Sequence, residues 1–262
     1  MFGEWNVTSK LISTLTPLGA RFVPEGFRVS QQQQQQQQQE EEDINATEEH
    51  AYALRFYSTL PPTFDNQARV FLGLGGIQDA VIADKAFNTK STVSSFLGYS
   101  GAVSSVEYDP AESPLRQTVV LSSLGGDLAP LPPRRLELYV NALSKEENEE
   151  STVFRTSELV RQVLVAVRDV QVLDYEILNE YTRKSSGGGR RNSSDGTDLI
   201  KGRQRSMLYL QPQDELYFQS GGKPVVVYDY EFEMKRVKAP EDAQEMGAVA
   251  CVLTPKQVVQ CI

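Results

Sequence analysis

Residues 225–237 read VVVYDYEFEMKRV, and this stretch decides the fold. Large apolar side chains fall on one side of the chain, and acidic and basic side chains fall on the other. Such period-two alternation predicts a strand with one buried face and one solvated face. The stretch is also about twice as long as the usual strand of about five to six residues. Strands of this length suit a barrel or a strongly bent sheet. The inward side of this strand carries Tyr228, Tyr230, Phe232 and Met234.

The same alternation recurs along much of the chain. Residues 173–181 repeat it, with Tyr175 and Ile177 on the apolar side. Residues 154–167 fit a helix or a strand, and their many valines favour a strand. The chain therefore contains about nine or ten strands, most of them neighbours in sequence. A meander of this kind avoids two exposed edges by closing on itself. We expect an all-β, antiparallel, lipocalin-like barrel of about nine to ten strands.

One short helix is expected at residues 88–98. Asn88 can cap its first turn, and Gly98 can adopt the left-handed conformation that ends a helix. Residues 145–150 carry a run of charges and predict a turn.

A chain of 262 residues is long enough for one large β domain. We expect the barrel to span residues 1–238. Nine glutamines followed by an acidic run predict a disordered loop at residues 30–49. The Gly/Ser/Arg-rich stretch predicts a flexible insertion at residues 185–202. Alternation stops at residue 239, so residues 239–262 are expected to form a loose tail.

The charge balance disfavours two classes of partner. The chain has 26 basic and 35 acidic residues and a net charge of −9. This balance opposes nucleic-acid binding and attraction to an anionic bilayer. No apolar run reaches the ~18 residues that a spanning helix needs, so an integral membrane protein is not expected. The N-terminal residues MFGEWNV also lack the features of a signal peptide.

The residues that usually carry hydrolytic or metal chemistry are scarce. His50 is the single histidine, and the two cysteines are Cys251 and Cys261. No cluster with the spacing of a zinc site or of a Ser–His or Cys–His nucleophile is present. We expect no catalytic residue, metal or cofactor. The two cysteines either close a small disulfide loop or remain free thiols.

Two polar positions have both a structural and a functional interpretation. Asp84 stands near the helix start, where a carboxylate is favoured. It can also anchor Arg116 or Arg161 in a buried ion pair, and a structural role is the favoured interpretation. Asp214 and Tyr217 lie in the loop before the last long strand. This loop either forms the rim of the barrel mouth or makes a tight turn through the aspartate.

Two resemblances add to these expectations. Gly3-Glu4-Trp5 resembles the GxW motif of lipocalin-like proteins. That resemblance implies that Trp5 plugs the closed end of the barrel, covered by Arg236 or Lys235. A wider resemblance links the chain to an uncharacterised protein family of cyanobacteria and plastids. It is carried by the segments FGEWNVTSKLIS, VIADKAFN, EYDPAESPLRQTVVL and LYLQPQDELYFQSGGKPVVVYDYEFE.

The wider resemblance implies a chloroplast location, with the thylakoid lumen as the compartment for some plant members. It implies a transit peptide outside this chain and supplies no catalytic residues.

The function expected from the sequence is binding of a small apolar molecule by a non-enzymatic protein. A pigment, a lipid or an isoprenoid fits the implied location. The ligand is expected to contact Tyr228, Tyr230, Phe232, Met234, Tyr175 and Ile177. The alternative is an auxiliary or assembly protein of a photosynthetic membrane complex, with the barrel filled by its own side chains. An enzyme is the third hypothesis.

Overall fold

The structure of the chain is a computed structural model. It describes residues 3–24, 49–58, 81–109, 112–122, 134–148, 153–165, 170–183, 199–237, 251–253 and 259–261. The predicted loop at residues 30–49 and the predicted insertion at residues 185–202 lie largely outside these ranges.

The described residues form one sheet of twelve strands. Its long strands are β1 (Gly3–Leu15), β2 (Glu49–Ser58), β6 (Arg134–Glu147), β7 (Val153–Val165), β8 (Val170–Arg183), β9 (Leu199–Tyr209) and β10 (Val226–Arg236). Its short strands are β3 (Val81–Ala83), β4 (Val103–Glu107), β5 (Arg116–Leu121), β11 (Cys251–Leu253) and β12 (Val259–Cys261).

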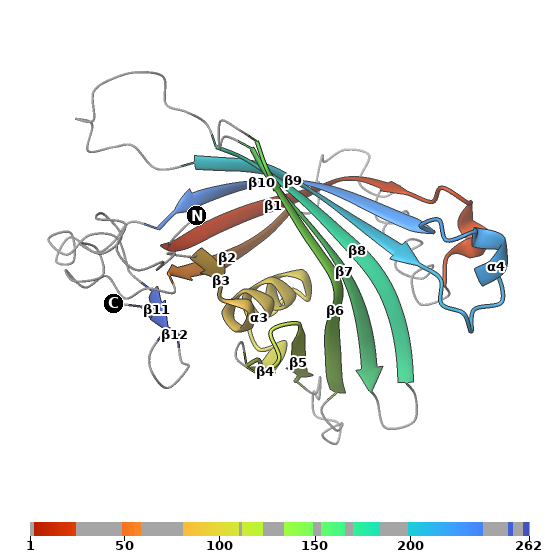
Figure 1. Cartoon of the computed structure of the whole chain (residues 1–262), viewed down its shortest axis with the longest axis horizontal. Helices are drawn as coiled ribbons and strands as arrows, with labels where there is room; N and C mark the ends of the chain where they lie inside the picture. The colour runs from red at the N-terminus through yellow and green to blue at the C-terminus, as the bar shows by residue number, and fades with distance from the viewer. Residues whose placement is uncertain are drawn as a thin grey trace, which may run out of the picture.

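Neighbours in sequence are neighbours in the sheet from β4 to β10, and every pair among them is antiparallel. Strand β1 then pairs with β10, and β2 pairs with β1. The sheet curls into a half-barrel (Figure 1). The predicted all-β antiparallel meander is confirmed. In the tail predicted as loose, β11 pairs with β12 and with β2, and Cys251 stands in register with Cys261.

Helix α3 (Lys85–Phe96) lies in the hollow of the curved sheet (Figure 1). It packs against β2 and β4, two strands that do not pair with each other within the described ranges. A 3-10 turn, η1 (Ala20–Phe22), and a single helical turn, α4 (Tyr217–Ser220), complete the helical structure described. The helix thus occupies the interval between the two sides of the half-barrel.

Two local predictions are wrong. The helix begins at Lys85 rather than at residue 88, because Asp84 is the N-cap and its carboxylate accepts a hydrogen bond from the amide of Phe87. Residues 145–147 are not a turn, because β6 continues to Glu147 opposite Phe154. Gly98 has a φ of 77°, as expected of the residue that ends the helix.

The side of the sheet that faces α3 is called the concave face here. Phe96 of α3 identifies it, because its ring centroid lies 4.0 Å from that of His50, 6.3 Å from that of Tyr52 and 5.9 Å from that of Tyr230. Residues in register with these side chains, and every second residue along each strand, share this face. The opposite side is the convex face.

Both ends of the concave face are packed with apolar side chains. One end holds the Trp5 cluster, which consists of Trp5, Val7, Ile200, Phe232 and Met234. The other end holds the Val225 cluster, which consists of Phe22, Val23, Leu208, Leu210, Val225 and Val226. Strand β10 runs from the second cluster to the first. Burial of these side chains supplies the main driving force for folding.

The convex face carries cross-strand ion pairs. Arg205 makes a two-pronged pair with Asp229, and Arg161 makes another with Asp174. Further pairs join Arg155 to Glu180, Arg203 to Glu231 and Lys201 to Glu233. The charged side of the sequence alternation therefore faces solvent in matched pairs.

Substitution of Gly202 tests the packing of the Trp5 cluster. A methyl group on Gly202 would collide with the ring of Phe232 and with the carbonyl oxygen of Glu180. We expect Gly202→Ala to lower the free energy of unfolding by about 1–3 kcal/mol, as overpacking does. Urea denaturation measures the change. Gly101→Ala is the matched control, because its methyl group would meet no atom within 4 Å. Equal stability of the two variants would contradict the described packing.

Substitution of Asp229 tests the convex ion pairs through pH. The hydrogen bonds from Arg205 lower the pKa of Asp229. A carboxylate with a lowered pKa stabilises the fold above its unfolded pKa of about 3.9, and this contribution disappears as the pH falls through the folded pKa. We expect Asp229→Asn to lower stability at pH 7 by about 0.5 kcal/mol, since water screens the pair. The difference from wild type should shrink below about pH 4. Thermal unfolding across pH checks this, and a constant difference would contradict it.

Candidate functional site

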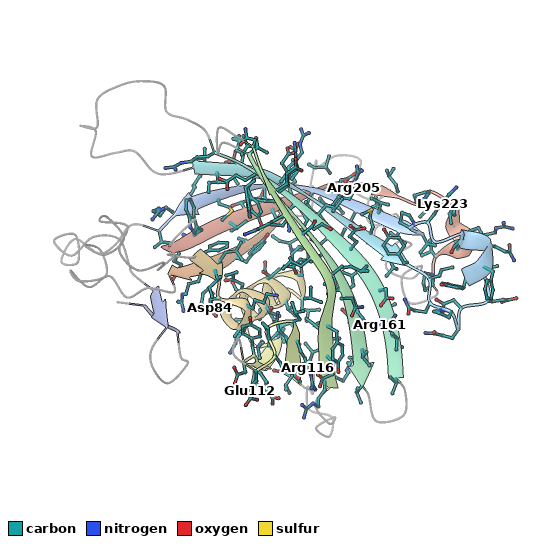
Figure 2. All side chains as sticks on the ribbon, in the orientation of Figure 1. Asp84, Glu112, Arg116, Arg161, Arg205 and Lys223 are labelled. Carbon is teal, nitrogen blue, oxygen red and sulfur yellow. The ribbon has the colours of Figure 1, made fainter. Side chains whose placement is uncertain are left out.

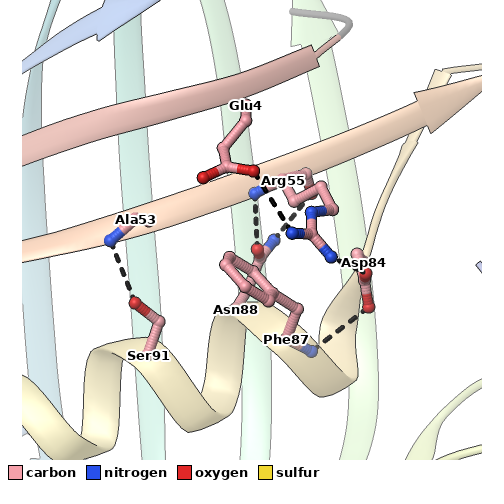
Figure 3. A network of polar contacts seen from close by, with 7 residues as sticks. All are labelled: Glu4, Ala53, Arg55, Asp84, Phe87, Asn88 and Ser91. Atoms are coloured by element: carbon pink, nitrogen blue, oxygen red, sulfur yellow. Dashed lines mark hydrogen bonds and ion pairs between the residues drawn. The ribbon is translucent and has the colours of Figure 1, made fainter. Parts of the chain in front are cut away.

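The seam between β2 and α3 is held by polar side chains of the helix (Figure 3). The amide of Ala53 donates to Ser91 Oγ at 2.9 Å, and the amide of Arg55 donates to Asn88 Oδ1 at 2.6 Å. Asn88 Nδ2 in turn donates to the carbonyl oxygen of Arg55 at 3.1 Å. Asn88 therefore bonds to the edge of β2 as a neighbouring strand would, rather than capping the helix.

Asp84 extends this network to β1. Its carboxylate lies 3.8 Å from Arg55 Nη1, and Arg55 Nη2 lies 3.2 Å from Glu4 Oε2. The guanidinium of Arg55 also stacks over the ring of Phe87, with its carbon 3.9 Å from the ring centroid. Burial raises the pKa of Asp84, while the Phe87 amide and the charge of Arg55 act in the opposite direction. The ion pair joins three elements, as a structural role requires.

The partners predicted for Asp84 are wrong. Arg116 pairs with Glu137 at 3.0 Å, and Arg161 pairs with Asp174 at 2.8 Å. Both arginines lie away from Asp84 in Figure 2. The predicted buried anchor is instead Arg55, which belongs to the neighbouring strand β2.

The loop before β10 makes a tight turn. The amide of Gln211 donates to the carboxylate of Asp214, and the amide of Tyr217 donates to the carbonyl oxygen of Asp214. Tyr217 packs against the Val225 cluster. The turn accounts for Asp214, and the rim role proposed for this loop stays a prediction.

Trp5 has the surroundings that the lipocalin-like motif implies. Its side chain is 2% exposed, and it stands opposite Arg236 in the β1–β10 register. The guanidinium carbon of Arg236 lies 4.9 Å from the centroid of the Trp5 ring system. The position favours a cation–π contact. Its role as a barrel plug stays a prediction.

The middle of the concave face is polar and half-buried. One row across β10, β9, β8 and β7 consists of Tyr230, Gln204, Asn179 and Thr156, each in register with the next. The adjacent row consists of Tyr228, Ser206, Ile177 and Glu158. We call these eight residues the central band. The band lies between the Trp5 cluster and the Val225 cluster.

Two hydrogen bonds within the central band are long. Asn179 Nδ2 lies 3.4 Å from Thr156 Oγ1, and Gln204 Nε2 lies 3.3 Å from Ser206 Oγ. Typical N–H···O bonds are about 2.9–3.0 Å long. Each amide also has further donor and acceptor positions. These groups are therefore suited to bonding an additional molecule.

Burial raises the pKa of the tyrosines around the band. Burial, followed by the charge of Glu158, raises the pKa of Tyr175 to about 12. Burial likewise raises the pKa of Tyr181, Tyr52 and Tyr228. At neutral pH these phenols are uncharged and can donate or accept a hydrogen bond.

Glu158 is the single carboxylate of the central band. It stands in register with Leu143 on β6 and Ile177 on β8. Within the described ranges its carboxylate forms no hydrogen bond or ion pair. Glu158 was not among the site residues expected from the sequence pattern. The sequence feature that could have identified it is the alternation of residues 154–164. In that alternation Glu158 falls on the same side as Phe154, Val160 and Leu164.

The six predicted ligand-binding residues all lie on the concave face, but at different depths. Phe232 and Met234 are 6% and 0% exposed and belong to the Trp5 cluster. Tyr228 and Tyr175 pack against the Val225 cluster while remaining partly buried. Tyr230 and Ile177 are half-buried. The structure thus separates two packed residues from four that border or form the central band.

A groove of about 550 Å³ lies elsewhere, beside α3. It is lined by one residue of β2, Ala51, and otherwise by α3 and the turn after it, including Lys90, Ser94 and Tyr99. Ala51 lies between His50 and Tyr52, so it points away from the concave face. The hydroxyl of Ser94 is buried and has no hydrogen-bond partner among the residues that the structure describes.

The described ranges hold neither a metal-binding cluster nor a membrane-spanning helix. No group of three or more histidine, cysteine, aspartate or glutamate residues there could hold a metal ion. None of the described helices is both long enough and apolar enough to cross a membrane.

A comparison with protein families gave one match. The family is described as a domain of unknown function (DUF6816), and its model matches residues 1–238. Neither the curated proteins nor the solved structures gave a match.

Replacement of Asn88 tests the seam. Asn88→Leu removes the acceptor for the Arg55 amide and the donor to the Arg55 carbonyl oxygen. The Arg55 carbonyl oxygen keeps its hydrogen bond from the Asp84 amide, but the Arg55 amide is left unsatisfied. Because an unsatisfied backbone amide is costly, we expect a loss of about 1–3 kcal/mol in the free energy of unfolding. Hydrogen exchange of the β2 amides should accelerate more than that of β8. Lys90→Leu on the exposed side of α3 is the control, and an equal effect there would contradict the role of Asn88.

Proposed function

The chain belongs to the DUF6816 family, and we propose that it is a non-enzymatic protein that binds a small, largely apolar molecule on the concave face of its half-barrel. The ligand contacts Tyr230 and Ile177 at the centre and Tyr228 and Tyr175 at one side. Phe232 and Met234 belong to the packed wall beside it.

The proposal depends on one observation, the contrast in burial along the concave face. Met234 and Val226 are 0% exposed at its two ends, whereas all eight residues of the central band except Tyr228 lie clear of both packed clusters and none is fully buried. Ligand sites are concave, mostly apolar and supplied with a few polar groups that orient the ligand. The apolar walls and the polar band match that description.

The residues of the central band favour recognition over catalysis. Their amides, phenols and hydroxyls donate and accept hydrogen bonds at fixed positions. Such groups orient a bound molecule without changing it. A pigment, a lipid or an isoprenoid is a suitable ligand, and the plastid resemblance supports a chloroplast location, with the thylakoid lumen as the proposed compartment.

A second candidate function is that of an auxiliary or assembly protein of a photosynthetic membrane complex. Two observations favour it. Both ends of the concave face are filled by the chain's own side chains. Phe218 of α4 is 87% exposed, and an exposed aromatic side chain of this kind is common at protein interfaces. Native mass spectrometry of the protein from its own source separates the two functions, since a retained small molecule favours binding and retained subunits favour assembly.

Binding of N-phenyl-1-naphthylamine, a neutral probe that fluoresces in apolar surroundings, tests the ligand proposal. We expect saturable binding by the wild-type protein. Ile177→Trp fills part of the central band and should weaken binding by about fivefold or more, which corresponds to about 1 kcal/mol.

Leu178→Trp is the matched control, because it adds the same side chain to the convex face of the same strand. It should bind the probe as the wild type does. Circular dichroism confirms that both variants fold. Absence of probe binding by the wild type, or equal weakening by both variants, would exclude the concave face as the site.

A further inference from the structure

We infer that Glu158 is the anchor for a positively charged amino group, so that the ligand of the concave face is an amphipathic amine with an apolar body. This inference rests on the proposed ligand-binding function and adds the chemical class of the ligand.

The position of Glu158 is fixed by two strand registers. Leu143 of β6 and Ile177 of β8 stand directly opposite it. Thr156 and Val160, two residues before and after it, share its face. Glu158 therefore lies in the central band, between the half-buried polar row and the Val225 cluster.

The electrostatic surroundings of Glu158 differ from those of the convex carboxylates. Asp174, Glu180 and Asp229 each bond to an arginine of a neighbouring strand. Glu158 has no such partner within the described ranges. A partly buried carboxylate is costly unless a cation or several donors compensate for its lost hydration.

Cations in the described part of the chain do not supply this compensation. Arg155 and Arg161 flank Glu158 in sequence, but both face the convex side and pair there. Lys145 lies diagonally across from Glu158 on β6, and its side chain is exposed and forms no ion pair with Glu158. The negative charge of Glu158 acts instead on three tyrosines. It helps to raise the pKa of Tyr108, Tyr175 and Tyr181.

The surroundings of Glu158 also define the rest of the ligand. Thr156, Asn179 and Gln204 provide hydrogen-bonding groups along one row. Ile177 and Leu143 provide apolar surface directly beside the carboxylate. A protonated amine would pair with Glu158 while its apolar body covers these side chains. A ligand with an anionic head would meet like-charge repulsion at the same position.

Displacement of N-phenyl-1-naphthylamine by three probes with the same dodecyl chain tests the inference. The probes are dodecylamine, dodecanol and dodecanoate, all used below their aggregation concentrations. We expect the wild-type protein to bind dodecylamine about tenfold or more tightly than dodecanol, and dodecanoate more weakly than dodecanol. The preference for the amine should fall with added salt.

Three variants assign the preference to Glu158. Glu158→Gln should lose the preference and bind dodecylamine and dodecanol about equally. Glu158→Asp keeps the charge on a shorter side chain and should retain part of the preference. Glu180→Gln makes the same change of net charge on the convex face and should keep the full preference. Thermal unfolding confirms that each variant folds.

The outcomes separate the anchor from the function that it serves. Equal binding of amine and alcohol by the wild type, or a preference that persists in Glu158→Gln, overturns the role of Glu158 and leaves the ligand-binding function intact. If neither the fluorescent probe nor dodecanol binds, the ligand-binding function fails, and the anchor fails with it. Loss of the preference in Glu180→Gln would show a general charge effect and would also overturn the anchor.

Discussion

The structure depends on how the open edge of β2 is satisfied. An unpaired strand edge presents backbone donors and acceptors that must find partners, and a closed barrel supplies them from another strand. Here β3 pairs with the end of β2 from Phe56 to Ser58, and the side chains of Asn88 and Ser91 of α3 supply partners for the part before it. A helix is wider than a strand, so this solution keeps the two sides of the sheet apart and holds α3 in the hollow. Phe96, on the last turn of α3, thereby reaches His50 and Tyr230. The packing of α3 against β2 therefore accounts for both the seam and the shape of the concave face.

The two faces of the sheet handle charge in different ways. On the convex face the ion pairs between β7 and β8 and between β9 and β10 join neighbouring strands. Solvent hydrates these charges, so each pair adds little stability, but the pairs help to fix the strand register. On the concave face the central band places amides, hydroxyls and one carboxylate between two apolar clusters. Residues chosen for stability alone would continue the apolar packing of Met234 and Val226 across this region. The polar central band departs from the apolar packing on either side of it. Such departures from optimal packing are expected at binding sites.

Much of the fold could be predicted from the sequence, because period-two alternation reports directly which residues share a face. Residues 173–181 and 225–237 show this, and so does the valine-rich segment that forms β7. The helix start was misplaced because Asn88 and Asp84 both suit an N-cap, and only the tertiary contact with β2 assigns Asn88 to the seam. The charged residues 145–147 look like a turn because β6 extends into solvent there, where charge is tolerated in a strand.

For the site, alternation placed Tyr230 and Ile177 on the correct face. It could not give depth along the strand, so Phe232 and Met234 were assigned to a ligand although they fill the Trp5 cluster.

The alternation pattern alone also could not place Glu158 on the concave face. In a segment that fits both a helix and a strand, the face of a single glutamate is undefined until the strand register is known. Once β7 is aligned with β8, Glu158 is opposite Ile177 and in phase with Val160, so it faces inward. From this half-buried position the carboxylate of Glu158 can form a charge-assisted hydrogen bond with a bound cation, which the neutral amide of a glutamine of the same shape cannot match. An amphipathic amine would therefore contact both the carboxylate of Glu158 and the apolar side chains beside it.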